Sequence, residues 1–128
     1  FMYSKKENFL KSIETVQQSD GCYRPTKYAV TRWFNILNDV LFSNSLDKFK
    51  TVTIKQMKRA WGECRGNDDQ SCDLILHNRF NTKSEFIEVL GHEMVHHYQW
   101  LFEDDMGHGD TFFAWKKLFN KNNLELSK

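Results

Sequence analysis

A chain of 128 residues fits a single domain with one hydrophobic core. Hydrophobic residues make up 40% of the sequence and aromatic residues 15%, which excludes a chain that is disordered throughout. The 18 Lys and Arg against 17 Asp and Glu leave a net charge of +1. This balance excludes a general electrostatic attraction to nucleic acid or anionic membranes, but not a local charged patch.

The three cysteines, Cys22, Cys64 and Cys72, are too few and too scattered for a disulfide framework or a CxxC zinc site. Cys64 and Cys72 could pair, but the odd count favours reduced thiols. No segment resembles a signal peptide or reaches the roughly 20 apolar residues of a membrane span. We therefore expect a cytoplasmic or nucleoid-associated protein without a membrane partner.

The first predicted helix lies in residues 1–25, which we expect to form an N-terminal helical extension. Ser4 and Glu7 make a capping box, and apolar residues follow at helical spacing. Thr26 is expected to cap a second helix, which the polar residues 43–45 end. The apolar stripe of this second helix consists of Val30, Trp33, Phe34, Leu37, Val40 and Leu41.

Three short segments in the middle of the chain are predicted to be extended. Residues 51–55 are rich in β-branched side chains, residues 60–64 begin a second strand, and residues 72–77 form another beyond a polar turn at 66–70. We expect these segments to pair in a short mixed or antiparallel sheet.

Two more helices are predicted after the sheet. Thr82 and Glu85 make a second capping box, which opens a long amphipathic helix through Leu101. A loop of acidic residues and glycines follows, and Asp110 is expected to cap the last helix. The aromatic and apolar side chains of that helix are Phe112, Phe113, Trp115, Leu118 and Phe119. The order of elements predicts an α+β fold.

The strongest motif is His92-Glu93-Met94-Val95-His96, an HExxH pattern inside the long predicted helix. The spacing from i to i+4 puts two imidazoles on one helical face, where both can reach one metal ion. Glu93 lies beside the first imidazole and can take a proton from water that the metal acidifies. Because a shuffled sequence of this composition contains the pattern about once in a hundred, two solvated surface histidines are the alternative.

A catalytic zinc needs a third protein ligand and an open fourth position. The metzincin continuation is excluded, because Gln99 and Phe102 stand where glycine and histidine would be required. A thermolysin-like ligand would be a glutamate on a later helix, and Glu125 near the C-terminus is the only one there. His97 points about 100° away from His96 around the helix.

His108 lies between two glycines just before the last helix, in a loop that can fold back over a metal. His77 closes a strand and has no matching motif. We therefore choose His108 as the third ligand, with Glu103, Asp104 and Asp105 as substitutes.

The segments HEMVHHY and GHGDTF resemble the SprT-like metalloprotease family, which includes Spartan-type proteases. The similarity extends upstream through Trp-Gly-Glu-Cys at residues 61–64 and covers residues 26–128. It implies a zincin-like minimal metalloprotease domain with one zinc ion per chain. His92, His96 and His108 would be its ligands and Glu93 its general base. Family members cleave proteins, often those crosslinked to DNA, and Spartan-type members are activated by DNA.

A local basic stretch, Lys55, Lys58, Arg59 and Arg65, surrounds Trp61 and has a composition suited to single-stranded DNA. The alternative, which we favour, is a solvated strand edge on which Lys discourages aggregation. Trp61 is interpreted either as a wall of a substrate cleft, beside an edge that pairs with an extended peptide, or as a core residue.

Tyr98 could donate a hydrogen bond to the oxyanion of peptide hydrolysis, but its place on the apolar stripe favours core packing. Cys64 has no catalytic histidine near it in sequence and is interpreted as packing. Gly91 costs about 1 kcal/mol relative to alanine inside a helix, which either a close approach of the sheet or the last helix explains, or the fold simply tolerates. Asp110 is favoured as a helix cap over a hydrogen-bond partner of a ligand histidine.

The sequence therefore predicts a zinc-dependent endopeptidase that acts on protein substrates. Two alternatives stay open: a metal-stabilised DNA- or protein-binding module without catalysis, and a zinc hydrolase with another substrate.

Overall fold

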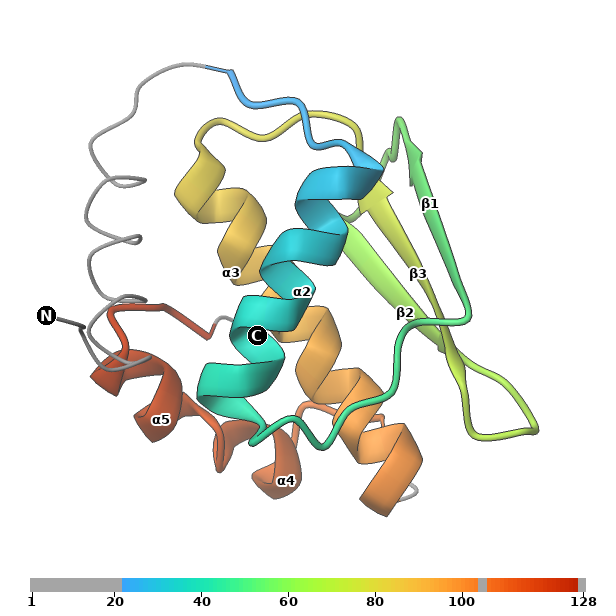
Figure 1. The fold of residues 1–128 in the computed structure, drawn as a ribbon, viewed down its shortest axis with the longest axis vertical. Coiled ribbons are helices and arrows are strands. Elements are labelled where there is room, and N and C mark those ends of the chain that lie inside the picture. Colours follow the sequence, from blue (N-terminus) through green and yellow to red (C-terminus); the bar gives the residue numbers. More distant parts are fainter. Residues whose placement is uncertain (1–21, 104–105, 127–128) are drawn as a thin grey trace, which may run out of the picture.

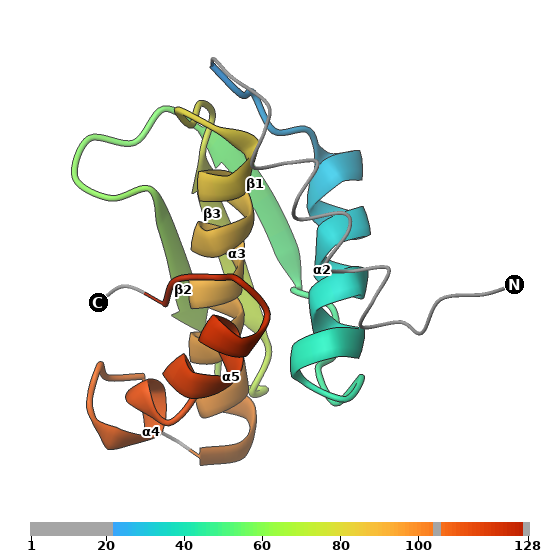
Figure 2. The ribbon, with the colours of Figure 1, turned by 90° about the vertical axis from the view of Figure 1, so that its left-hand side faces the viewer.

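The computed structural model describes residues 22–103 and 106–126, and shows a small α+β fold (Figure 1). The predicted helix that begins at Ser4 lies outside the described residues. Helices cover one face of a three-stranded sheet, and the long helix α3, Lys83–Tyr98, packs against both the sheet and a neighbouring helix (Figure 2). Within the described ranges, no helix combines the length and hydrophobicity that crossing a bilayer requires.

Helix α2, Lys27–Leu41, begins where the sequence predicts. The hydroxyl of Thr26 accepts a hydrogen bond of 3.1 Å from the backbone N–H of Ala29, which satisfies one free donor of the first turn. The predicted stripe is buried except for the half-buried Val40. The helix ends in a turn whose residues Ser43 and Asn44 both have positive φ.

The sheet consists of β1, Thr51–Lys55, β2, Gly62–Gly66, and β3, Cys72–His77, in the spatial order β1-β3-β2. Strand β1 pairs with β3 in parallel and β2 pairs with β3 antiparallel, so the predicted mixed sheet is confirmed. The second strand begins two residues later than predicted, at Gly62. Because β3 is central, its side chains facing the helices are fully buried, whereas β2 forms an edge next to α3.

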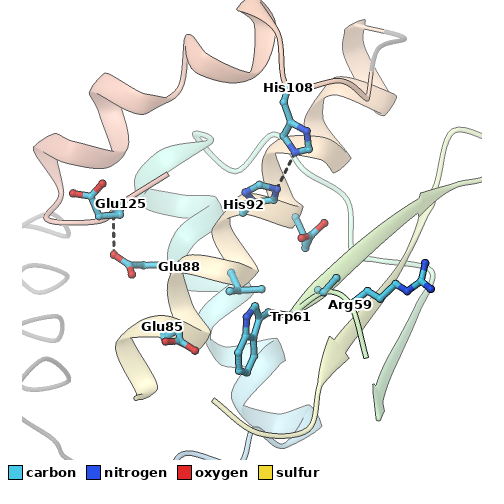
Figure 3. Close-up of a pocket in the computed structure, with 11 residues that line it drawn as sticks. Arg59, Trp61, Glu85, Glu88, His92, His108 and Glu125 are labelled. Carbon is cyan, nitrogen blue, oxygen red and sulfur yellow. Dashed lines mark hydrogen bonds between the residues drawn. The ribbon is translucent and has the colours of Figure 1, made fainter. Parts of the chain in front are cut away.

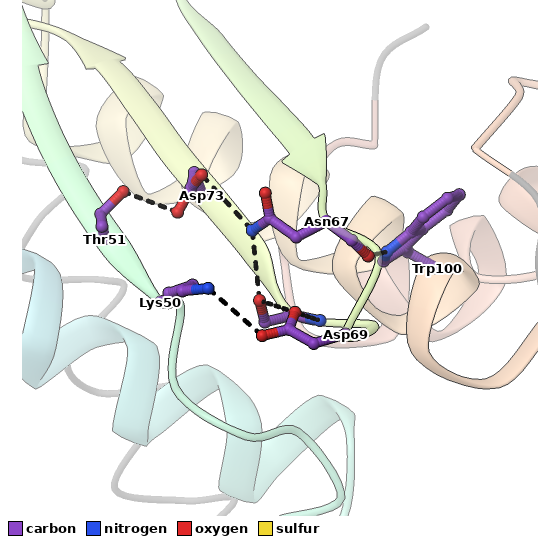
Figure 4. A network of polar contacts seen from close by, with 7 residues as sticks. Lys50, Thr51, Asn67, Asp69, Asp73 and Trp100 are labelled. Atoms are coloured by element: carbon purple, nitrogen blue, oxygen red, sulfur yellow. Dashed lines mark hydrogen bonds and ion pairs between the residues drawn. The ribbon is translucent and has the colours of Figure 1, made fainter.

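A polar network holds the β2–β3 turn in place (Figure 4). Asp69 accepts hydrogen bonds from the N–H and hydroxyl of Ser71 and forms an ion pair of 3.2 Å with Lys50. On the other side, the indole N–H of Trp100 donates to the carbonyl of Asn67 at 2.9 Å. The turn is thereby tied both to the start of β1 and to the segment that follows α3.

Helix α3 carries the HExxH motif. Thr82 caps it by accepting from the N–H of Glu85 at 3.0 Å, but the predicted reciprocal bond of a capping box is not formed. Instead, Glu85 Oε2 accepts from the amide of Asn81 at 3.5 Å, and Oε1 has no partner among the described residues. The α-helix was predicted to continue through Leu101, and this is wrong. It ends at Tyr98, and the chain continues as a π-helical segment, η1, Gln99–Glu103.

The last predicted helix is wrong as a single element. The chain forms two short helices, α4, Asp110–Phe113, and α5, Lys116–Lys121. Gly109 occupies the N-cap of α4 and makes no side-chain bond, so Asp110 is the first residue of the helix and not its cap. The break lets the aromatic side chains of the two helices pack against different parts of the core. The ring centroid of Trp115 lies 4.6 Å from that of Phe42.

Gly91 marks the closest approach of α5 to α3. A Cβ atom at this position would lie 2.8 Å from Cε2 of Phe119, closer than packed carbon atoms can come. Phe119 is fully buried, so its ring cannot swing aside into solvent. The predicted close approach is therefore confirmed as the reason for a glycine inside this helix.

Candidate metal centre

Two imidazoles of α3 converge on one point. His92 and His96 are one helical turn apart, and their Nε2 atoms are 3.2 Å from each other. His96 is buried and His92 is half-buried, so the pair lies at the boundary between the core and the open side of α3.

The loop between η1 and α4 brings a third imidazole to the same point. Nε2 of His108 lies 3.1 Å from Nε2 of His96 and 3.2 Å from that of His92. Ligand nitrogens about 2.0–2.1 Å from a tetrahedral zinc ion lie about 3.3–3.4 Å apart, close to the spacing here. The three residues therefore fit a metal ion, and His108 leaves its own side of the centre open because it is exposed.

Glu103 ends η1, and the other two acidic alternatives, Asp104 and Asp105, lie outside the described residues. Among the residues that the structure describes, the three histidines are the one group of three or more potential ligands whose donor atoms converge.

Gln99 links the two parts of the centre. Its side-chain oxygen lies 2.7 Å from Nδ1 of His96, and its amide nitrogen donates to the carbonyl of Gly107 at 3.0 Å and the hydroxyl of Thr111 at 2.8 Å. Because the amide oxygen can only accept, Nδ1 of His96 carries the proton and Nε2 keeps its lone pair for a metal. The fully buried Gln99 thus orients one ligand and holds the loop of His108.

The ring of Phe112 packs against all three imidazoles. Its fully buried ring lies 4.8 Å from the ring of His92, 5.0 Å from that of His96 and 4.8 Å from that of His108, measured between centroids. The first turn of α4 therefore fixes the orientation of the ligand rings as well as the loop before it.

Glu93 is 5% exposed and lines a cavity of about 410 Å³ together with His92 and His108 (Figure 3). Burial raises the pKa of Glu93 to about 8, and the negative charge of Glu63 adds to this. Gly62 lets β2 pass close by, because a Cβ atom there would lie 3.1 Å from Oε2 of Glu93. Desolvation makes the carboxylate a stronger base than one in water.

The other histidines lie elsewhere. His97 is fully buried as its position on the helix predicts, with Nε2 2.7 Å from the carbonyl of Asp47 and its ring stacked on Phe49. His77 packs against Trp61 with 5.1 Å between ring centroids. Neither contributes to the metal centre.

Trp61 lines the cavity, with 45% of its surface exposed, so the structure places it at the wall and not in the core. Tyr98 is not brought to the metal centre. It packs among aromatic rings, 4.9 Å from Trp115 and 4.7 Å from Phe102, because two residues of helix turn it away from His96. The contacts of Tyr98 therefore support the interpretation as a packing residue and not the one as a hydrogen-bond donor to an oxyanion.

The basic stretch does not form one continuous patch. Arg65 is bonded to the carboxylate of Glu63. Lys55 and Arg65 lie opposite residues four apart on β3, which separates them by about 13 Å along the sheet. Lys58 and Arg59 are exposed in the connection before β2, next to the cavity.

Cys64 and Cys72 are both free thiols. A hydrogen bond to Cys72 and burial raise the pKa of Cys64, so this thiol stays protonated. Its role is packing between β2 and α3, as the sequence suggests, and not nucleophilic attack.

The model of the SprT-like family matches residues 30–128, which include most of α2, the sheet, all three converging histidines and Glu93. The chain belongs to the SprT-like family. No curated protein matches the chain significantly. Family membership and the histidine cluster together support a metal-binding domain of a type associated with metalloprotease activity.

Sequence reasoning did not identify Gln99 as part of the centre. A signal was present, because a polar residue three positions after His96 lies on the same helical face as that ligand.

Proposed function

We propose that this chain is a zinc-dependent endopeptidase with a zincin-like active site. The observation that carries the proposal is the triangle of three Nε2 atoms 3.1–3.2 Å apart, with the buried carboxylate of Glu93 in the adjoining cavity. Three neutral imidazoles that leave one position open are typical of catalytic zinc sites, whereas structural sites are closed by a fourth protein ligand.

When bound by His92, His96 and His108, zinc supplies Lewis acidity, which acidifies water and polarises a carbonyl. Glu93 then accepts the proton of the attacking water and delivers it to the leaving amine. A cation beside Glu93 favours the ionised carboxylate over the protonated one, which offsets the effect of burial on its pKa. Gln99 keeps the His96 ring in the orientation that this chemistry needs.

Strand β2 provides a surface for an extended substrate. It is an edge strand of the described sheet and runs past α3, and Gly62 at its start lies next to Glu93. A peptide that adds to this edge by main-chain hydrogen bonds would pass in front of the three histidines. Sequence-independent backbone pairing suits a protease whose substrates are unfolded segments of proteins.

The test combines metal analysis with cleavage of casein. We expect one zinc per chain in the native protein, and little zinc in His92→Ala, His96→Ala and His108→Ala. Glu93→Gln is nearly isosteric and is expected to keep zinc while cleavage falls about 10²–10⁴-fold, because amide nitrogen cannot accept a proton. Zinc without cleavage in the native protein would instead support the non-catalytic metal-stabilised module.

We also propose that single-stranded DNA promotes cleavage of DNA-bound proteins, as the family resemblance implies. Lys58 and Arg59 support this, because they are exposed beside the cavity and form no ion pair with the described acidic residues. A DNA strand held there would bring attached proteins to the metal centre.

A further inference from the structure

The cavity beside the metal centre has an acidic wall. Glu85, Glu88 and His92 follow one another at i, i+3 and i+7, so they lie along one face of α3. Glu125 comes from the C-terminal segment, where its backbone N–H donates to Oε2 of Glu88 at 2.8 Å. Glu85, Glu88, Glu125 and Trp61 all line this cavity, and Figure 3 shows Glu88 and Glu125 at one side of it and Trp61 at the other. We name these four residues, Trp61, Glu85, Glu88 and Glu125, the acidic pocket.

The segment that carries Glu125 is firmly anchored. Leu124 and Leu126 on either side of it are 2% and 1% exposed, so the chain alternates between core and pocket. The hydrogen bond to Glu88 fixes the backbone between them. The fold therefore fixes the backbone position from which the side chain of Glu125 extends.

Within the described ranges, no basic side chain neutralises the charges of the acidic pocket. None of its three glutamates forms an ion pair with a described Lys or Arg. Burial raises the pKa of Glu88 and outweighs the opposing effect of the hydrogen bond from the backbone of Glu125, and the charges of Glu125 and Glu85 add to the rise. Oε1 of Glu85 has almost no exposed surface and no hydrogen-bond partner among the described residues.

Arg59 lines the same cavity but does not neutralise the three glutamates. Arg59 comes from the connection before β2, and its side chain extends away from the three glutamates (Figure 3). Half-buried carboxylates that no described cation faces, such as Glu85 and Glu88, are costly, and a cation on a bound ligand would lower that cost.

A metal ion is not the cation that fits. The donor atoms of the three glutamates do not converge, because the histidine cluster is the one convergent group of three or more ligands in the described ranges. The acidic pocket also has an apolar side. Trp61 exposes 45% of its surface, and its ring centroid lies 5.6 Å from that of the buried Phe80. Val89 also lines the cavity.

A long side chain with an apolar stem and a cationic head matches this combination. The stem of lysine or arginine would lie on Val89 and the indole, and its head would meet carboxylates and the aromatic face. Along α3, Glu88 and Glu85 lie about 6 and 10.5 Å from His92, one and two turns away. A residue close to the scissile bond could therefore reach them.

Given the endopeptidase function proposed above, we infer that the acidic pocket is a specificity subsite that takes a lysine or arginine side chain of the substrate beside the cleaved bond. Glu85, Glu88 and Glu125 select its charge, and Trp61 holds its stem.

Cleavage sites mapped by mass spectrometry on a mixture of denatured proteins test the inference. We expect lysine and arginine to be enriched at one fixed position from the cleaved bond. The double variant Glu85→Gln, Glu88→Gln should lose the enrichment, since glutamine keeps an oxygen for the N–H of Glu125 but carries no charge. Asp68→Asn, an exposed acid on the β2–β3 turn, removes one charge elsewhere and should keep it.

Paired peptides that differ only in lysine or norleucine at that position give the magnitude. We expect native protein to prefer the lysine peptide about 10-fold or more in kcat/KM, as charge-assisted bonds allow. In the double Gln variant the ratio should approach one, and Glu85→Lys with Glu88→Lys should shift the preference to glutamate at that position.

A binding measurement separates this inference from the enzymatic function. Zinc-loaded Glu93→Gln protein should bind the lysine peptide about 10-fold more tightly than the norleucine peptide. Tryptophan fluorescence measures the binding of each peptide. Equal binding of both peptides would overturn the inference whatever the activity. Cleavage without any basic preference would also overturn it and leave the endopeptidase function standing.

Discussion

Replacing Gln99 by methionine tests whether one buried amide organises the metal centre. Methionine has a similar length and fills irregular space, so the packing around position 99 should survive. The change removes the acceptor for Nδ1 of His96 at 2.7 Å and the donors to Gly107 at 3.0 Å and Thr111 at 2.8 Å. His96 would then be free to adopt the other tautomer, and the loop of His108 would lose both of its bonds to Gln99.

Partners that orient a metal ligand typically contribute 10–100-fold to metal affinity, which corresponds to about 1.4–2.8 kcal/mol. We expect Gln99→Met to weaken zinc binding by this factor. The assay is competition with a chromophoric chelator at neutral pH, with circular dichroism to establish that the fold is retained.

Gln99→Glu is the matched control. Its carboxylate still accepts from Nδ1 of His96 but can no longer donate to Gly107 or Thr111. We expect affinity within a few-fold of the native protein. A Gln99→Met protein that is folded and binds zinc within twofold of the native affinity would refute the role of Gln99. Equal losses in both variants would place the effect in the loop contacts and not in the His96 ring.

Three further predictions concern stability and DNA. Gly91→Ala should lower the melting temperature by a few degrees, because overpacking against Phe119 costs about 1–3 kcal/mol and exceeds a helix-propensity gain of about 1 kcal/mol; a higher melting temperature would contradict it. Asp69 has its pKa lowered to about 2, first by the bonds from Ser71, so the stability it contributes is present above its ordinary pKa of 3.8 and lost as the pH falls towards 2. In metal-free protein the difference in melting temperature between native and Asp69→Asn should therefore shrink from pH 7 to pH 2.5, and a constant difference would count against it. Lys58→Glu with Arg59→Glu should reduce the salt slope of log K for single-stranded DNA by about 1.4, two contacts at about 0.7 each, without changing zinc content; an unchanged slope would place any DNA contact elsewhere.

Local rules were sufficient for much of this molecule. Thr26 and Thr82 predict the starts of α2 and α3, because a hydroxyl before an apolar periodic segment supplies the missing hydrogen-bond acceptor. The β-branched residues 51–55 predict β1. The spacing of His92 and His96 determines that both imidazoles share one face, since it depends only on the 100° turn of each helical residue. The same rule sends His97 away into the core.

Features that depend on contacts between segments far apart in the sequence could not be predicted from these local rules. The position of His108 beside His92 and His96 depends on the packing of Phe112 and the bonds of Gln99, which hold the loop against α3. The break between α4 and α5 likewise follows from where the aromatic side chains dock and not from their spacing.

The acidic pocket shows the same division. Glu85 and Glu88 share a helical face that is visible in the sequence, but Glu125 reaches Glu88 across 37 positions of chain, and Trp61 reaches the cavity through the pairing of β2 with β3. Helix and strand periodicities determine the direction of a side chain relative to its own element. Which elements meet is decided by the burial of apolar surface over the whole chain. The sequence therefore determined locally that His92 and His96 share a face, and the tertiary structure determined the rest of the candidate site.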